Sequence, residues 1–151
     1  MEMLQFVVVA LGKEEYGLDV QRVREIIKFD KVTHIPDVDE YIAGVINVRG
    51  KLIVVLDIAK KMSIDLADTQ EKFVVISEMN DRLIGFIIDK ATEVLNVESD
   101  KISQPPRAVV KKSEVKQVAI LSESRIVMLL DIDSILSDKE QEAIEAIEKT
   151  A

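Results

Sequence analysis

The segment KLIVVLDIAKKM (residues 51–62) recurs later in the chain as RIVMLLDIDSIL (residues 125–136). In each copy an apolar run ends at an aspartate, Asp57 or Asp131, and is followed by residues that can form a helical turn. An aspartate at such a position accepts hydrogen bonds from the exposed backbone N–H groups of the first turn. Each segment is therefore predicted to be a buried strand that leads into a short, N-capped helix.

A second pair of similar segments lies upstream of the first pair, in the same order. GLDVQRVREII (17–27) aligns with GFIIDKATEVL (85–95), which places Glu25 over Glu93. Blocks that recur in one order at nearly one spacing indicate an internal duplication. The boundary between the two copies is expected in the polar, turn-prone segment 63–71.

Two hairpins are also expected, because residues 4–20 and 72–88 each contain two apolar runs joined by a polar turn. Each copy then has about five short strands and one short helix, which is typical of small barrels rather than of βαβ units. The sequence predicts a mainly β protein with two barrel-like halves, at about 14–66 and 82–136. The N-terminal strand and the C-terminal helix are free to cross between these halves.

Two further segments have clear local signals. Residues 99–116 include Pro105 and Pro106, which cannot join a central ladder, so an irregular loop is expected. In SDKEQEAIEAIEKT, Ser137 and Glu140 have capping-box spacing and the apolar residues recur at helical intervals. This last segment is predicted to be an amphipathic helix.

The composition is that of a folded protein with 151 residues, 48% hydrophobic content and a formal net charge of -8. This charge argues against nucleic acid as a partner, because that binding depends on clustered Lys and Arg. No apolar run reaches the roughly 18 residues of a membrane-spanning helix, and the first residues lack signal-peptide features. We expect a soluble, unprocessed protein without membrane insertion. The absence of cysteine fits a reducing compartment, the cytoplasm.

Reactive side chains are few. His34 is the only histidine and has no evident triad partner. GVINVRGK (44–51) resembles a phosphate-binding loop, but five residues separate its glycines, and Leu52 occupies the position that needs a Mg²⁺-binding hydroxyl. Asp57 and Asp131 are not interpreted as phospho-accepting aspartates, because the sequence lacks the alternating strands and helices of a doubly wound sheet. We expect no enzyme activity, no cofactor and no metal site.

Two surface candidates remain open at this point. Val23, Ile26 and Ile27 lie among charged residues, where they either complete the core or line an apolar patch for a partner. Arg49 is either a solvated turn residue before Gly50, whose positive φ would suit a turn between strands, or a residue that faces a partner.

The segments EYGLDVQRVREII, VTHIP, YIAGVINVRGKLIVVLDI, GFIIDKATEVL and ISQPP follow one another along the chain. In this order they resemble the CheW family of chemotaxis coupling proteins and the related regulatory domain of the histidine kinase CheA. The Gly-Val-Ile-Asn-x-Arg-Gly run is the most specific element. The lack of a kinase, phosphotransfer or receiver region in these residues favours CheW over a CheA fragment or CheV.

The resemblance implies a single domain, residues 1–151, made of two intertwined five-stranded SH3-like β-barrels with short helices and a C-terminal helix. It implies a non-enzymatic cytoplasmic adaptor, monomeric when isolated, that couples chemoreceptor cytoplasmic tips to the regulatory domain of CheA. Within the family, the alternative is an adaptor of another histidine-kinase pathway, such as type IV pilus signalling.

By motif, the resemblance also implies an apolar receptor-binding groove between the barrels. Its candidate residues are Val23, Ile27 and Val94, with Phe73 as a weaker one. The duplication could bring matching apolar positions, such as those around Ile27 and Val94, to opposite sides of one seam.

A second implied site is the turn that couples receptor and kinase, with candidates Gly44, Arg49 and Gly50. Glu25 is the expected partner of the Arg49 guanidinium, whose planar fork suits a carboxylate better than lysine would. The sequence departs from the family pattern at Val48, where Leu is common, and at Val54, where the strand commonly has Pro.

Overall fold

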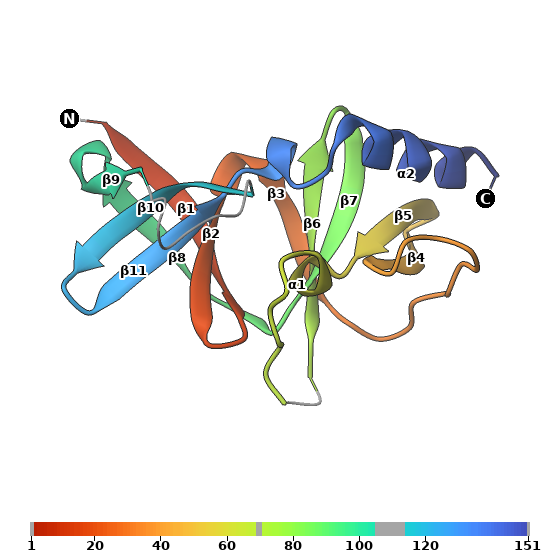
Figure 1. Cartoon of the computed structure of the whole chain (residues 1–151), viewed down its shortest axis with the longest axis horizontal. Coiled ribbons are helices and arrows are strands. Elements are labelled where there is room, and N and C mark those ends of the chain that lie inside the picture. Colours follow the sequence, from red (N-terminus) through yellow and green to blue (C-terminus); the bar gives the residue numbers. More distant parts are fainter. Residues whose placement is uncertain (1, 69–70, 105–113, 151) are drawn as a thin grey trace.

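The structure is a computed structural model that describes residues 2–68, 71–104 and 114–150. Its strands form two sheets that lie side by side, and a C-terminal helix lies along one of them (Figure 1). The predictions of a mainly β protein and of a C-terminal helix are thus confirmed.

The six-stranded sheet has β2 and β11 as parallel neighbours, and its other neighbours are antiparallel. In spatial order its strands are β8 (Lys90–Glu98), β1 (Met3–Leu11), β2 (Glu14–Asp19), β11 (Arg125–Leu130), β10 (Val115–Ser122) and β9 (Ile102–Ser103). Two 3₁₀ turns adjoin it: η2 (Ser99–Lys101) and η3 (Ile132–Ser134).

The five-stranded sheet has β5 and β7 as parallel neighbours, and its other neighbours are antiparallel. In spatial order its strands are β3 (Val23–Lys28), β6 (Phe73–Met79), β7 (Arg82–Ile88), β5 (Lys51–Leu56) and β4 (Ile42–Val48). The remaining helical elements are η1 (Val20–Arg22), α1 (Ile58–Lys61) and α2 (Asp138–Thr150).

The internal duplication explains how both sheets are built. The aligned segments make β2 and β3 the equivalents of β7 and β8, and β5 the equivalent of β11. Each sheet combines the hairpin of one copy, β1–β2 or β6–β7, with strands of the other copy, and the strand order is the same in both. The two copies are therefore intertwined.

The expected halves, 14–66 and 82–136, do not coincide with the two sheets. β2 lies in the six-stranded sheet with β8 to β11, and β7 lies in the five-stranded sheet with β3 to β5. The parallel pairs β2–β11 and β5–β7 therefore join strands of different copies. The expected loop at 99–116 is wrong at its ends. There η2 and β9 form, β10 begins at Val115, and β9 gives its sheet a sixth strand. The part of that loop at 105–113 lies outside the described residues.

The predicted hairpins and helix caps are confirmed. β1 pairs with β2 and β6 pairs with β7. The Lys60 N–H donates to the Asp57 carboxylate at 3.2 Å, and the Asp133 N–H donates to the Asp131 carboxylate at 3.2 Å. At α2, the Glu140 N–H donates to Ser137 Oγ at 3.2 Å, and the Ser137 N–H donates to the Glu140 carboxylate at 2.8 Å. Both halves of the capping box are therefore formed.

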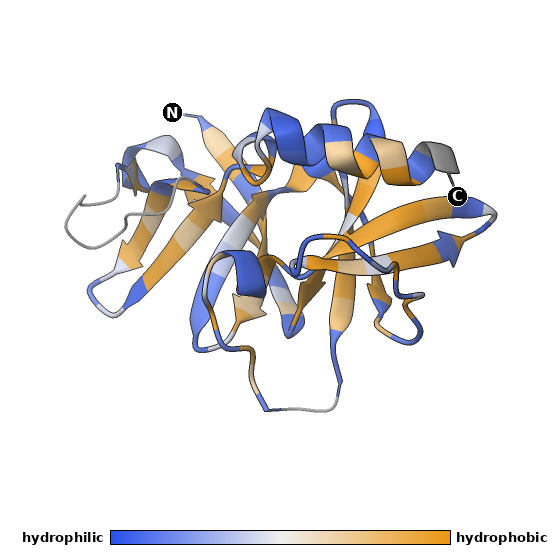
Figure 2. Cartoon of the chain, turned by 45° about the vertical axis from the view of Figure 1, so that its right-hand side comes forward, coloured by the Kyte–Doolittle hydropathy of each residue, from blue (hydrophilic) through white to orange (hydrophobic). Residues whose placement is uncertain are grey.

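Apolar side chains on alternate positions of the strands enter different core clusters. In β5, Val54 and Leu56 belong to the main cluster, which draws on both sheets and on α2, whereas Ile53 and Val55 belong to a second cluster on the other face. A third cluster lies within the six-stranded sheet and includes Val127 and Leu129 of β11. Both faces of each sheet therefore contain apolar residues, and the strands in Figure 2 are mostly in hydrophobic colours.

Candidate functional site

The β4–β5 turn is a tight two-residue connection at Arg49 and Gly50. Val48 pairs with Lys51 across it, and both central residues have positive φ, 50° for Arg49 and 84° for Gly50. The Gly50 N–H donates to Asn47 Oδ1 at 2.9 Å. Positive φ at both positions is the geometry of the tight turns that suit hairpins, so the turn holds Arg49 at a fixed, exposed tip.

Arg49 forms the expected ion pair with Glu25 of β3. Its Nη1 lies 3.3 Å from Glu25 Oε1, and its Nη2 contacts Oε2. The Arg49 side chain is 74% exposed and that of Glu25 is 29% exposed. The hydrogen bond from Arg49 lowers the pKa of Glu25, and the same bond raises the pKa of Arg49. Both groups are therefore charged at neutral pH.

This ion pair joins opposite sides of the five-stranded sheet. β3 is one edge strand, and the turn belongs to the β4–β5 hairpin at the other edge. A second connection between the same edges is made by Thr33, which follows β3 and exchanges two backbone hydrogen bonds of 2.9 Å with Val45 of β4. The sheet is therefore curled, and Arg49 and Glu25 lie where its edges approach each other.

Gly44 has a structural role rather than a place in the turn. It is buried within β4 with a φ of 148°, and a Cβ there would lie 2.1 Å from the Thr33 carbonyl oxygen and 2.7 Å from Val32 Cγ1. Glycine is required so that the segment after β3 can approach β4. Of the residues predicted for the coupling turn, the structure brings together Glu25, Arg49 and Gly50 and separates Gly44 from them.

A depression of about 670 Å³ lies beside the turn. Its apolar lining residues are Val48, Ile53, Ile76 and Leu83, and its charged ones include Arg24, Lys51, Glu78 and Asp81 as well as Glu25 and Arg49. Arg24 is ion-paired with Glu78. A depression lined by charged residues together with four apolar ones suits the binding of another protein surface, in which charges set orientation.

The four residues predicted for the receptor-binding groove do not share one face. Val23 and Phe73 are partly buried against the main cluster, Ile27 is partly buried against the second cluster, and Val94 is 56% exposed on β8 of the other sheet. A bulge in β3 separates Val23 from Ile27, because Val23 pairs with Ser77 while Glu25 already pairs with Ile76. The extra residue moves Val23 to the opposite face.

The structure thereby decides the question left open for β3. Val23, Ile26 and Ile27 are all partly buried against core clusters, so they complete the core and offer only part of their surface to a partner. Val94 is the one among the groove candidates with a largely exposed side chain.

The six-stranded sheet contains an ion-pair cluster that includes Glu93, the equivalent of Glu25. Arg125, at the start of β11, donates to both Glu15 oxygens, at 2.9 Å and 3.0 Å, and also contacts Glu93 of the edge strand β8. The hydrogen bonds that Arg125 donates to Glu15 and Glu93 raise the pKa of Arg125. Sequence reasoning missed Arg125, although the alignment of Glu25 with Glu93 was a signal for it.

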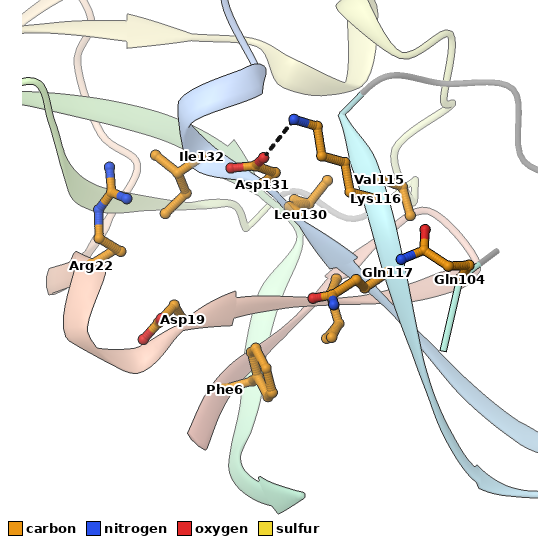
Figure 3. Close-up of a pocket in the computed structure, with 11 residues that line it drawn as sticks. Phe6, Asp19, Arg22, Gln104, Val115, Lys116, Gln117, Leu130, Asp131 and Ile132 are labelled. Carbon is orange, nitrogen blue, oxygen red and sulfur yellow. Dashed lines mark ion pairs between the residues drawn. The ribbon is translucent and has the colours of Figure 1, made fainter. Parts of the chain in front are cut away.

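A second depression, of about 790 Å³, lies between η1, η3 and the β10–β11 ladder (Figure 3). Lys116 pairs with Asp131 at 3.2 Å, as the dashed line in Figure 3 shows. Arg22 donates to Asp133 at 2.7 Å and to the Glu78 carbonyl at 2.8 Å, which ties η1 to η3 and β6. The Lys116–Asp131 pair lies within one copy, and the bonds of Arg22 join the two copies.

Two further properties bear on function. Within residues 2–68, 71–104 and 114–150, no group of three or more His, Cys, Asp or Glu side chains could hold a metal ion. Among the helices in the described parts of the chain, none has the length and apolar character needed to cross a membrane.

Comparison with known proteins identifies the family. Residues 5–140 match the sequence model of the CheW-like domain, which covers most of the chain. The chain belongs to the CheW family. Chemotaxis protein CheW of Klebsiella aerogenes is 32% identical over 149 residues, which are 97% of this chain and 89% of that protein. Chemotaxis protein CheW of Bacillus subtilis is 32% identical over 138 residues, 90% of this chain and 88% of that protein.

A solved CheW structure has the same fold. The crystal structure of scaffolding protein TtCheW from Thermoanaerobacter tengcongensis superposes with a TM-score of 0.82 at 28% identity, and it covers 91% of this chain and 90% of that one. The intertwined sheets described above are therefore the CheW arrangement, and the Arg49 turn lies within the matched domain.

Proposed function

We propose that this CheW-family chain is a non-enzymatic chemotaxis adaptor that couples chemoreceptor cytoplasmic tips to the histidine kinase CheA. The relatives described above are named as chemotaxis proteins, and the solved structure is titled a scaffolding protein. The observation that carries the proposal is the Arg49 turn, which is held rigidly and exposed beside a depression lined by charged and apolar residues. Such a surface is suited to binding proteins rather than to chemistry.

In this proposal the turn and the edge strand β8 have separate roles. Arg49, oriented by Glu25 and by the Gly50 turn, presents guanidinium donors that a partner carboxylate can accept. Val94 provides the most exposed apolar surface of the groove residues, whereas Val23, Ile27 and Phe73 lie on the other sheet, partly buried against two core clusters. We assign Val94 to the receptor tip, because an amphipathic helix binds through its apolar stripe.

The test is a titration of the purified chain with a receptor-tip fragment and, separately, with the regulatory domain of CheA. Saturable binding to both, together with receptor-dependent control of CheA autophosphorylation, is the expected result. Binding to neither fragment would overturn the proposed function. Binding to a histidine kinase of a pilus pathway, but not to CheA, would assign the chain to that pathway.

A further inference from the structure

Two isoleucines at the end of the β10–β11 hairpin form an exposed apolar pair. Ile120 and Ile126 lie opposite each other in the ladder and are 46% and 50% exposed. Further along the same face of the same strands, Val118 and Met128 pack into the main core cluster. The apolar face of this sheet therefore extends beyond the part that the core covers.

The equivalent face of the five-stranded sheet is partly covered by α2, which leaves Leu52 39% exposed. β5 is the equivalent of β11, so Leu52 corresponds to Ile126 and Val54 to Met128. α2 contacts β5, and its Ile144 is fully buried in the cluster that contains Val54. Figure 1 shows α2 along the five-stranded sheet and far from β10 and β11. One sheet thus holds a helix over part of this face, and its equivalent has two isoleucines with no helix of this chain near them.

The charge beside the covered face fits the acidic α2. Val54 lies opposite Ile84 in the parallel β5–β7 pair. Two residues earlier on each strand, Leu52 and Arg82 are therefore neighbours on this face. Arg82 forms ion pairs with two glutamates of α2: Glu145 at 3.6 Å and Glu148 at 3.7 Å.

The charge beside the exposed face is reversed. Met128 lies opposite Tyr16 in the parallel β2–β11 pair, so Ile126 and Glu14 are neighbours two residues earlier. Glu14 is exposed and takes the place that Arg82 has in the other sheet. A helix with the acidic flank of α2 would be repelled there, whereas a helix with a basic flank would be attracted.

We propose that Ile120, Ile126 and Glu14 form a docking face for an amphipathic helix of a partner protein, with an apolar stripe over the isoleucines and a basic flank against Glu14. The helix lies on the six-stranded sheet as α2 lies on the five-stranded sheet. Burial of the two exposed isoleucines supplies affinity, and the charge on Glu14 selects the partner. Charge disfavours the α2 helix of a second copy. This inference does not depend on the proposed chemotaxis function.

The probe is a labelled peptide of residues 137–151 with Glu145→Lys and Glu148→Lys, and the unsubstituted peptide is its control. Each is titrated against the full chain by fluorescence anisotropy. We expect saturable binding of the substituted peptide, about fivefold tighter than that of the control, since its two basic residues gain favourable charge contacts with Glu14. Equal affinities, or no saturable binding of the substituted peptide, would overturn the proposal.

Variants of the chain locate the contact. Ile126→Asp should abolish binding of the substituted peptide, and Glu14→Arg should reverse the preference between the two peptides. Met3→Asp is the matched control, because Met3 is 54% exposed at the end of β1 away from Glu14, and binding should be unchanged. Circular dichroism verifies folding of each variant. Unchanged binding by Ile126→Asp, or dimers of the wild-type chain that Ile126→Asp dissociates, would contradict the assignment.

Discussion

Gly17 of β2 lies directly opposite Leu129 of β11, and the equivalent Gly85 of β7 lies opposite Val55 of β5. Both pairs belong to parallel ladders that join strands from different copies. A Cβ at Gly17 would lie 2.8 Å from Leu129 Cδ2, and one at Gly85 would lie 2.8 Å from Val74 Cγ1. The two glycines allow close packing at equivalent points of the two sheets.

Larger side chains at these glycines should therefore destabilise both sheets in the same way. Gly17→Val and Gly85→Val should each lower the free energy of unfolding by about 1–3 kcal/mol, the usual cost of overpacking a filled interior. Ala91→Val on β8 is the control, since Ala91 is exposed and the change there should be nearly neutral. Urea unfolding measures all three variants. A neutral Gly17→Val variant would show that Leu129 can move away at little cost.

Much of this architecture could be predicted from the sequence because its signals are local. The hairpins, the caps at Asp57 and Asp131 and the duplication follow from residue patterns that short segments carry. The pairing of strands could not be predicted, because β2 meets β11 and β5 meets β7 across large separations in the chain. Strand periodicity shows which residues are apolar and does not show which strand lies beside them.

The candidate site shows the same division. The Arg49–Glu25 pair could be anticipated from the chemistry of the two side chains and the family resemblance. The faces of Val23 and Ile27 could not, because a single bulged residue in β3 changes which side each occupies. Arg125 was missed because its partners, Glu15 and Glu93, are distant in sequence and come together only in the folded sheet.

Gly44 and Gly50 should respond very differently to the same substitution. Gly44→Ala places a Cβ against the backbone of Thr33 at a positive φ, so we expect a loss of at least about 3 kcal/mol. Nothing lies within 4 Å of a Cβ at Gly50, and only its φ of 84° opposes alanine. Gly50→Ala should therefore cost about 1 kcal/mol. Chemical denaturation of both variants checks this, and equal losses would contradict the structural role of Gly44.

Removal of the Arg49 guanidinium should affect partners more than stability. Exposed ion pairs contribute little to folding, so Arg49→Ala should leave the melting temperature nearly unchanged. Receptor-dependent control of CheA in a reconstituted assay should fall. Arg49→Lys keeps the charge without the planar fork and should give an intermediate result. A large drop in melting temperature with normal kinase control would assign Arg49 to folding instead.

Because of the cap of α2, the free energy of unfolding should depend on pH in the acidic range. Burial opposes the charged form of Glu140, but hydrogen bonds from Lys61 and the Ser137 N–H outweigh it and lower its pKa from 4.5 to about 2. A carboxyl group with a lower pKa in the folded than in the unfolded state stabilises the fold at pH values above its unfolded pKa. This stabilisation is lost as the pH falls through the folded pKa. The stability difference between wild type and Glu140→Gln should thus be full above pH 4.5 and shrink towards pH 2. Thermal melts across this range test it, and a constant difference would contradict it.

Val94 gives the sharpest test of the proposed receptor contact. Its side chain is 56% exposed on β8, so Val94→Asp should leave the isolated chain folded. In a complex with a receptor tip, the new carboxylate would be buried without a partner, which is costly. We expect binding of the receptor-tip fragment to weaken more than about tenfold while binding of the CheA regulatory domain is largely retained.

Calorimetry with both fragments measures the Val94 effect, and circular dichroism verifies the fold. Met3→Asp is again the matched control, because Met3 is similarly exposed, at 54%, on the neighbouring strand β1. It should bind both fragments as the wild type does, since a charge at a free surface stays hydrated. If Val94→Asp instead loses CheA and keeps the receptor tip, β8 is the kinase contact. If Met3→Asp weakens receptor binding equally, the effect comes from charge on this sheet and not from the Val94 contact.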